Sequence, residues 1–225
     1  MKIIARIYTD FPQKFGIPRQ SGMVKELEGT IVFEPEYRDE AAVRGLEGFS
    51  HIWLLWEFSE NIKEGWSPTV RPPRLGGDKR VGVFATRSPF RPNPIGLSCV
   101  KLNEICKEPG RGVVLHVSGV DIMDGTPIYD IKPYLPHSDC HPEAVGGFAK
   151  EFEDYGLDVE FSDKLLSSVP ESKRKGLIGA LRNDPRPSYQ NDPARIYGMT
   201  FAGLNVKFTV DGGVLIVISV EKNQF

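Results

Sequence analysis

The stretch VVLHVSGVDIMDGTPIYDI, residues 113–131, contains the pattern that decides the fold. Apolar residues alternate from Val113 to Val120, the segment Asp121–Thr126 is a predicted turn, and Pro127–Ile131 is a second short strand. The connection is too short for the crossover helix that parallel strands require. The two strands are therefore predicted to be antiparallel.

Other segments of strand length precede this stretch. His51–Phe58, HIWLLWEF, is dominated by a run of five large apolar residues, which predicts a strand buried on both faces. A short helix that stops near Gly48 is expected at Arg38–Leu46. Because the connections are again mostly short, the first 135 or so residues are predicted to form an antiparallel barrel or closed sheet. Its further strands are expected at Lys2–Tyr8, Leu27–Phe33, Val81–Ala85 and Ile95–Ile105.

The character of the chain changes after Pro136, where a loop-like segment and then an acidic segment follow. We therefore expect two domains, a barrel over residues 1–140 and a small α+β domain over residues 141–225. Helices are predicted near Ser162–Leu166 and at Glu171–Leu181, followed by three strands. These strands span Arg195–Phe201, Leu204–Val210 and Val214–Val220.

Composition places the chain among ordinary globular proteins. Of its 225 residues 40% are hydrophobic and 26% are charged, and the net charge is −2. No window reaches the length of a membrane span and the N-terminus lacks a leader pattern, so a cytoplasmic protein without membrane contact is expected. Cys99, Cys106 and Cys140 are odd in number and have no CxxC spacing, which favours reduced thiols.

The most unusual segment is Arg71–Ser98, which is rich in arginine, proline and glycine. The segment from Arg71 to Arg91 contains six positively charged residues and one negatively charged residue. The prolines fix φ and keep the preceding residues extended, so the cations are presented on stiff backbone. An anionic ligand is therefore expected here, although a charge run of this kind is also typical of a solvated loop.

Several common sites are absent or weakly supported. Neither GxGxxG nor GxxxxGK[ST] occurs, which disfavours a dinucleotide fold or a phosphate loop, and no GxSxG elbow indicates a serine hydrolase. His137, Cys140 and His141 lie close together, but without a second ligand cluster a plain loop is favoured over a metal site. Asp124–Pro127 suits a plain turn and a ligand-binding turn equally well.

Six motifs together resemble the TrmO family, also called TsaA-like or YaeB-like proteins. They cover most of the chain, and the fourth and fifth are long and highly specific. The motifs are FGIPRQSG (15–22), EGFSHIWLLWEF (47–58), TVRPPRLGG (69–77), RVGVFATRSPFRPNPIGLS (80–98), DGTPIYDIKPYLP (124–136) and DPRPSYQ (184–190).

The resemblance implies a mainly β protein with a single-sheeted β-barrel, which acts as a homodimeric tRNA methyltransferase and uses S-adenosyl-L-methionine as the methyl donor. The implied acceptor is adenosine 37, next to the anticodon, that already carries a threonylcarbamoyl group on its exocyclic nitrogen. DNA is not an expected partner. The positions that match the family's donor site are Ser21, Gly22, Met23, Ser59, Glu60, Arg87, Leu97, Asp124, Gly125, Thr126 and Pro127.

Methyl transfer is an in-line displacement, so catalysis needs alignment and the removal of one proton from nitrogen. The family pattern does not identify the base, for which Asp124 and Asp184 are the candidates. Arg71, Arg74, Arg91 and Arg186 are candidates for tRNA phosphates, and Tyr189 is a candidate for base stacking.

Two other functions fit the same residues. A non-catalytic RNA-binding barrel would use the basic face without a methyl donor, and the binding of S-adenosylmethionine would distinguish it. A small-molecule methyltransferase would keep the donor site and lose tRNA. The second arginine loop at DPRPSYQ argues against that alternative, because a small acceptor does not need it.

Overall fold

The computed structural model describes residues 1–61, 65–72, 75, 79–152, 155–187, 190 and 192–223. Its N-terminal part is a closed barrel with the strand order β1-β2-β7-β6-β3-β8, and every neighbouring pair is antiparallel. The predicted mainly β barrel fold is thereby confirmed. The strands are β1 (Ala5–Thr9), β2 (Glu28–Phe33), β3 (His51–Glu57), β6 (Ile95–Glu108), β7 (Gly112–Ser118) and β8 (Thr126–Pro133).

Three long connections open from the same end of this barrel, which we call the mouth. They are the β1–β2 connection, the β3–β6 connection and the β7–β8 connection. Strand β6 is longer than its neighbour β7, so its first residues run past the end of β7 and pair on the other side with β3. The backbone of these residues is available to a loop of the mouth.

Strand β3 differs from the prediction because it is not buried on both faces. Ile52, Leu54 and Trp56 are buried and their neighbours are partly exposed. The outer face is apolar because helix α1 (Pro136–Asp139) covers part of it, and Trp53 donates a hydrogen bond of 2.8 Å from Nε1 to the Asp139 carboxylate. A covered outer face and a barrel core give the same apolar run in the sequence.

Two predicted elements are replaced by short 3₁₀ turns. The expected helix at residues 38–46 is split into η2 (Glu40–Val43) and η3 (Leu46–Gly48), because Gly45 has a φ of 87°. The expected strand at residues 81–85 is limited to β5 (Val81–Gly82), which pairs with β4 (Thr69–Val70) outside the barrel and continues into η6 (Val83–Ala85). This part also contains the 3₁₀ turns η1 (Pro35–Tyr37) and η4 (Ser59–Asn61).

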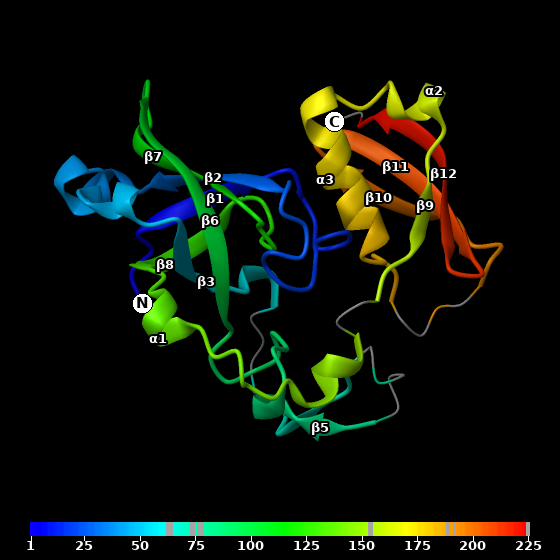
Figure 1. Ribbon diagram of the computed structural model, residues 1–225, viewed down its shortest axis with the longest axis horizontal. Helices are drawn as coiled ribbons and strands as arrows, with labels where there is room; N and C mark the ends of the chain where they lie inside the picture. Colours follow the sequence, from blue (N-terminus) through cyan, green and yellow to red (C-terminus); the bar gives the residue numbers. More distant parts are fainter. Residues whose placement is uncertain are drawn as a thin grey trace.

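The C-terminal part is a four-stranded sheet with the order β10-β11-β12-β9 (Figure 1). The predicted strands correspond to β10 (Tyr197–Phe201), β11 (Leu204–Asp211) and β12 (Val214–Lys222), and the predicted helices to α2 (Asp163–Leu166) and α3 (Glu171–Arg182). Strand β9 (Asp158–Glu160) was not predicted; it is short and pairs with β12 in parallel. The 3₁₀ helix η7 (Gly147–Phe152) precedes it. No helix in the described part of the chain is long and apolar enough to span a membrane.

The two parts share one hydrophobic core, and the β1–β2 connection joins them. Phe11 is fully buried and meets Phe201 edge to face, with 5.2 Å between ring centroids. Helix α3, on the side of the sheet that faces the barrel (Figure 1), packs so closely that a Cβ on Gly179 would lie 2.4 Å from a Val24 methyl carbon. This connection is therefore a structural element of both parts.

We predict that Phe11→Ala lowers the free energy of unfolding by about 3–5 kcal/mol, because it removes a fully buried ring from the shared core. The matched control is Phe84→Ala, whose ring is 73% exposed and which should change stability by no more than about 0.5 kcal/mol. Urea unfolding followed by circular dichroism measures both. Equal stability of the two variants would contradict the role of Phe11.

Candidate functional site at the barrel mouth

The β1–β2 connection brings Ser21 onto the part of β6 that runs past β7, and Gly22 onto the residue that follows β7. Ser21 Oγ accepts a hydrogen bond of 3.1 Å from Cys99 N, and Gly22 N donates one of 2.9 Å to Gly119 O. Gly22 has a φ of 78°, a conformation that favours glycine. The structure thus places Ser21 beside β6, which also carries Leu97, and Gly22 beside the start of the β7–β8 connection.

Arg87 reaches the same place from the β3–β6 connection. Its Nη1 donates a hydrogen bond to Gln20 Oε1, next to Ser21. Leu97 is 52% exposed and Met23 is 37% exposed, so apolar side chains also face solvent at this end of the barrel. Residues from three distant segments therefore meet at the mouth.

Beneath them lies a buried polar chain that the sequence reasoning missed. Trp56 Nε1 donates to Ser98 Oγ at 2.9 Å, and Ser98 Oγ donates to Asp121 Oδ1 at 2.6 Å. The Trp56 ring fits because residue 96 is glycine, where a Cβ would lie 2.2 Å from the ring. The sequence did contain a signal for the inward position of Ser98: side chains alternate along a strand, so Ser98 points to the same face as the apolar Val100.

Asp121 connects this buried chain to the surface of the mouth. Burial raises the pKa of its carboxyl group to about 6, although hydrogen bonds from Ser98 and the Ser21 backbone and the charge of Arg87 act in the opposite direction. The Asp121 carboxyl group therefore changes charge near pH 6, next to the predicted donor-site residues Ser21 and Arg87.

The segment Asp124–Pro127 lies at the same end of the barrel, where the β7–β8 connection enters β8. Asp124 Oδ1 accepts a hydrogen bond of 2.9 Å from Thr9 N, and the side chain is exposed. Gly125 has a φ of 73°, and its carbonyl accepts a hydrogen bond from Arg6, whereas Thr126 is buried. The turn is therefore rigid and keeps one carboxylate at the mouth.

Turn η4 contributes Ser59 and Glu60 to the same region. Lys14 Nζ, on the β1–β2 connection, donates a hydrogen bond of 3.1 Å to the backbone carbonyl of Glu60. Glu60 is exposed and Ser59 is half-buried. The two connections are thereby tied together at the rim of the mouth.

The predicted tRNA contacts are placed less uniformly. Arg71 is exposed. Arg91 stabilises the loop in which it lies, because its Nη1 donates hydrogen bonds to the backbone carbonyls of Thr86 at 2.8 Å and Ser88 at 3.4 Å. Arg74 and Tyr189 lie outside the residues that the structure describes.

Arg186 and Asp184 form a buried ion pair in the C-terminal part. Arg186 Nε and Nη2 donate to the two carboxylate oxygens at 2.8 and 3.0 Å, and the Tyr155 hydroxyl donates to Oδ2 at 2.7 Å. Burial alone would raise the pKa of Asp184, but these hydrogen bonds outweigh it and lower the pKa. The geometry favours a structural role for the pair, since both groups are engaged with each other.

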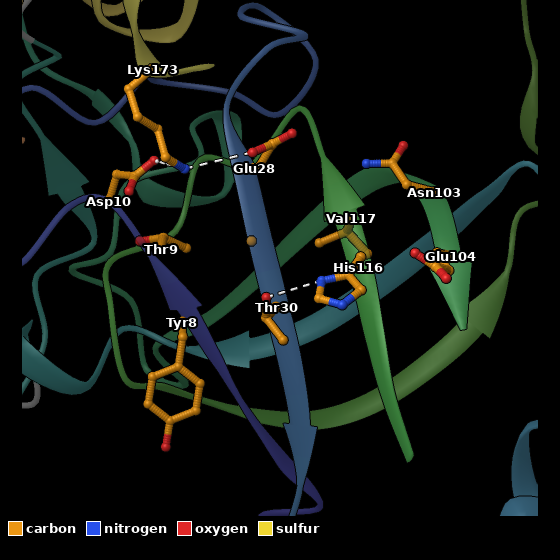
Figure 2. Close-up of a pocket in the computed structure, with 11 residues that line it drawn as sticks. Tyr8, Thr9, Asp10, Glu28, Thr30, Asn103, Glu104, His116, Val117 and Lys173 are labelled. Carbon is orange, nitrogen blue, oxygen red and sulfur yellow. Dashed lines mark hydrogen bonds and ion pairs between the residues drawn. The ribbon is translucent and has the colours of Figure 1, made fainter. Parts of the chain in front are cut away.

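A separate open groove of about 580 Å³ lies on the outer face of the barrel, between strands β1, β2, β6 and β7 and the start of α3 (Figure 2). Lys173 crosses its upper end, with Nζ 2.8 Å from an Asp10 carboxylate oxygen and 3.5 Å from one of Glu28. None of the predicted site residues that the structure describes lines this groove.

Both parts of the chain match family models. Residues 6–140 match the tRNA-methyltransferase O N-terminal domain, and residues 154–223 match the TrmO C-terminal domain. The gap between the two matches contains η7 and the start of the segment that leads to β9.

Similar proteins cover nearly the whole chain. A tRNA (adenine(37)-N6)-methyltransferase of Escherichia coli strain K12 is 38% identical over 97% of this chain and 96% of the relative. A Pseudomonas aeruginosa protein, which carries the name of an S-adenosylmethionine-dependent methyltransferase, is 40% identical over 90% of this chain and 89% of its own length. A crystal structure of TrmO from Pseudomonas aeruginosa superposes with a TM-score of 0.76 at 32% identity and covers 97% of this chain and 96% of that one.

We predict that Asp121→Asn changes how stability depends on pH. The folded-state pKa of about 6 is above the ordinary value of 3.8, so the unfolded chain ionises first as pH rises. Asp121 therefore lowers the stability of the wild-type protein progressively between about pH 4 and 6, by about 3 kcal/mol at most, and the loss persists at higher pH. Asparagine keeps the acceptor for Ser98 and abolishes this titration.

Urea unfolding at a series of pH values measures this difference. The stability of Asp121→Asn relative to wild type should rise between pH 4 and 6 and then level off. Asp211→Asn, an exposed aspartate in the β11–β12 hairpin, is the matched control and should follow the wild-type profile. Parallel profiles for wild type and Asp121→Asn would contradict the assignment.

Proposed function

This chain belongs to the tRNA-methyltransferase O family, and on that premise we propose how its barrel mouth carries out the reaction. The protein is an S-adenosylmethionine-dependent tRNA (adenine-N6) methyltransferase. The observation that supports a donor site at the mouth is the meeting of Ser21, Arg87 and Leu97, which come from three distant segments and lie near the half-buried Asp121.

The side chains at the mouth fit the groups of the methyl donor. Exposed Leu97 and Met23 offer apolar surface to an adenine ring, and the exposed guanidinium of Arg87 suits the amino-acid carboxylate. The side chains of Ser59 and Asp124 offer acceptors to ribose hydroxyls. When bound, the donor supplies an electrophilic methyl group on a sulfonium sulfur.

The protein must also remove a proton from the acceptor nitrogen. Of the two candidate carboxylates, Asp124 is exposed at the mouth, whereas Asp184 is held by Arg186 and Tyr155 in the C-terminal part. A carboxylate with a lowered pKa is a weaker base. We therefore assign the base to Asp124 rather than Asp184.

The tRNA surface is assigned to the basic β3–β6 connection. Arg71 and Arg87 are exposed there, next to an exposed aromatic pair, Trp66 and Phe84, whose ring centroids are 5.9 Å apart. Guanidinium groups attract phosphates, and exposed aromatic rings stack on unpaired bases. This combination suits an anticodon loop, whose bases are not paired.

The position of the chain in the cell and its oligomeric state are parts of the same proposal. A cytoplasmic homodimer would meet mature tRNA, and the family resemblance supports it. Phe84, Phe90 and Leu97 expose apolar surface near the mouth, which a second copy or a nucleic acid would cover. Light scattering during size-exclusion chromatography measures the mass in solution.

We predict that Arg87→Ala weakens the binding of S-adenosylmethionine by about 10- to 150-fold, because one charge-assisted interaction contributes about 1.5–3 kcal/mol. Isothermal titration calorimetry measures the dissociation constant. Arg44→Ala, at an exposed arginine on the opposite side of the barrel from the mouth, is the matched control and should bind as wild type. Unchanged affinity in folded Arg87→Ala would remove Arg87 from the donor site. If the wild-type protein failed to bind the donor, a non-catalytic RNA-binding barrel would be favoured instead.

We further predict that the protein methylates tRNA carrying threonylcarbamoyl-adenosine and leaves the unmodified transcript unmethylated. The amino lone pair of adenine is delocalised into the ring, whereas in the modified base the nitrogen belongs to a urea, whose proton is more easily removed. The added carboxylate also suits the exposed Arg71, which remains available when Arg87 binds the carboxylate of the donor. Radiolabelled methyl transfer to matched tRNAs measures the preference, and equal incorporation into both would contradict it.

A further inference from the structure

A second group of reactive side chains lies on the outer face of the barrel, near the hairpin that joins β6 to β7. Cys106 Sγ, a Glu108 carboxylate oxygen and a His116 ring nitrogen all lie within 4.8 Å of one another. His116 Nε2 is 3.4 Å from Glu108 Oε1. All three residues are half-buried, and this hairpin is at the opposite end of the barrel from the mouth.

The strand register holds these three residues in place. Cys106 and Glu108 are two residues apart on β6, so both side chains point to the same face. His116 lies on β7 opposite Glu104, and the ladder continues through Cys106 opposite Val114. The arrangement therefore depends on a regular hydrogen-bonded ladder and not on a loop.

A neighbouring strand orients the imidazole ring. His116 Nδ1 is 3.2 Å from Thr30 Oγ1 on β2, an interaction drawn in Figure 2. When Nδ1 donates its proton to Thr30, the lone pair of the ring is on Nε2, which faces Glu108. Histidines that bind metals are commonly fixed through their other nitrogen in this way.

The surrounding charges favour a cation. Glu104 lies on the same face as His116, so two carboxylates are close to the thiol. Arg111 binds Oε2 of Glu108 at 3.1 Å, which leaves Oε1 as the oxygen that faces His116.

We propose that Cys106, Glu108 and His116 bind one Zn²⁺ ion, with water or Glu104 in the fourth position. A thiolate, an imidazole and a carboxylate together suit zinc and disfavour Mg²⁺ or Ca²⁺, which take oxygen ligands. Ligand atoms around tetrahedral zinc are about 3.5 Å apart, so the side chains need to move by about 1 Å. Binding releases the Cys106 thiol proton to solvent. The site is independent of the proposed methyl transfer.

Titration of Zn²⁺ into the reduced, metal-free full chain tests the proposal by calorimetry. We expect one ion per chain, and Cys106→Ser and His116→Ala should each weaken binding by about tenfold or more. The matched controls are Cys140→Ser and His137→Ala. His137 is an exposed histidine in α1 and Cys140 is an exposed cysteine directly after it, so both variants should bind Zn²⁺ as wild type does. Loss of binding in the controls, or wild-type affinity in Cys106→Ser, would overturn the proposal.

Cobalt gives a readout that a change in folding does not imitate. Co²⁺ in place of Zn²⁺ should produce a near-ultraviolet thiolate-to-cobalt absorption band in the wild type and none in Cys106→Ser. Thr30→Val keeps all three ligands and removes the partner of His116 Nδ1, so it should retain the band and lower the affinity by about tenfold. Absence of the band in the wild-type protein would also overturn the proposal.

Discussion

The packing of the β1–β2 connection between the two parts of the chain is the constraint on which the rest of the structure depends. Phe11 fills the shared core against Phe201, and Val24 lies against Gly179 of α3. Between these two anchors the same connection presents Ser21 to β6 and Gly22 to Gly119, just after β7. The residues of the mouth are therefore positioned by the C-terminal part as well as by the barrel.

The stagger of the barrel makes this arrangement possible. Because β6 runs past β7, the backbone amide of Cys99 bonds to a loop at the position that a longer β7 would otherwise occupy. Asp121, in the connection that follows β7, then sits between that loop and the buried Ser98. A ligand site at a barrel mouth thus depends on unequal strand lengths as much as on the side chains themselves.

Most of the barrel could be predicted from the sequence, because period-two alternation and short connections are local signals. The predictions failed where distant packing decides the structure. Trp53 lies on the outer face of β3, where α1 covers it, and the sequence alone does not distinguish it from a core residue. Strand β9 forms only because it pairs in parallel with β12. The predicted donor-site residues came from long motifs, whereas the contact between Asp121 and Ser98 depends on a strand pairing that spacing does not reveal. The burial of Arg186 against Asp184 was equally hidden, since both residues lie in a polar, proline-rich segment.

The parallel pairing of β9 with β12 has a consequence for the order in which the chain folds during synthesis. The barrel is complete once Pro133 has left the ribosome, but β9 must wait for Val214–Ile216 before it can pair. Contacts so distant in sequence form late. Until α3 and the sheet that carries Phe201 have formed, Phe11 and Leu27 remain uncovered on the closed barrel, and a nascent chain of this length exposes apolar surface that chaperones can bind. The last strand to be made thus ends the period in which the first connection is exposed.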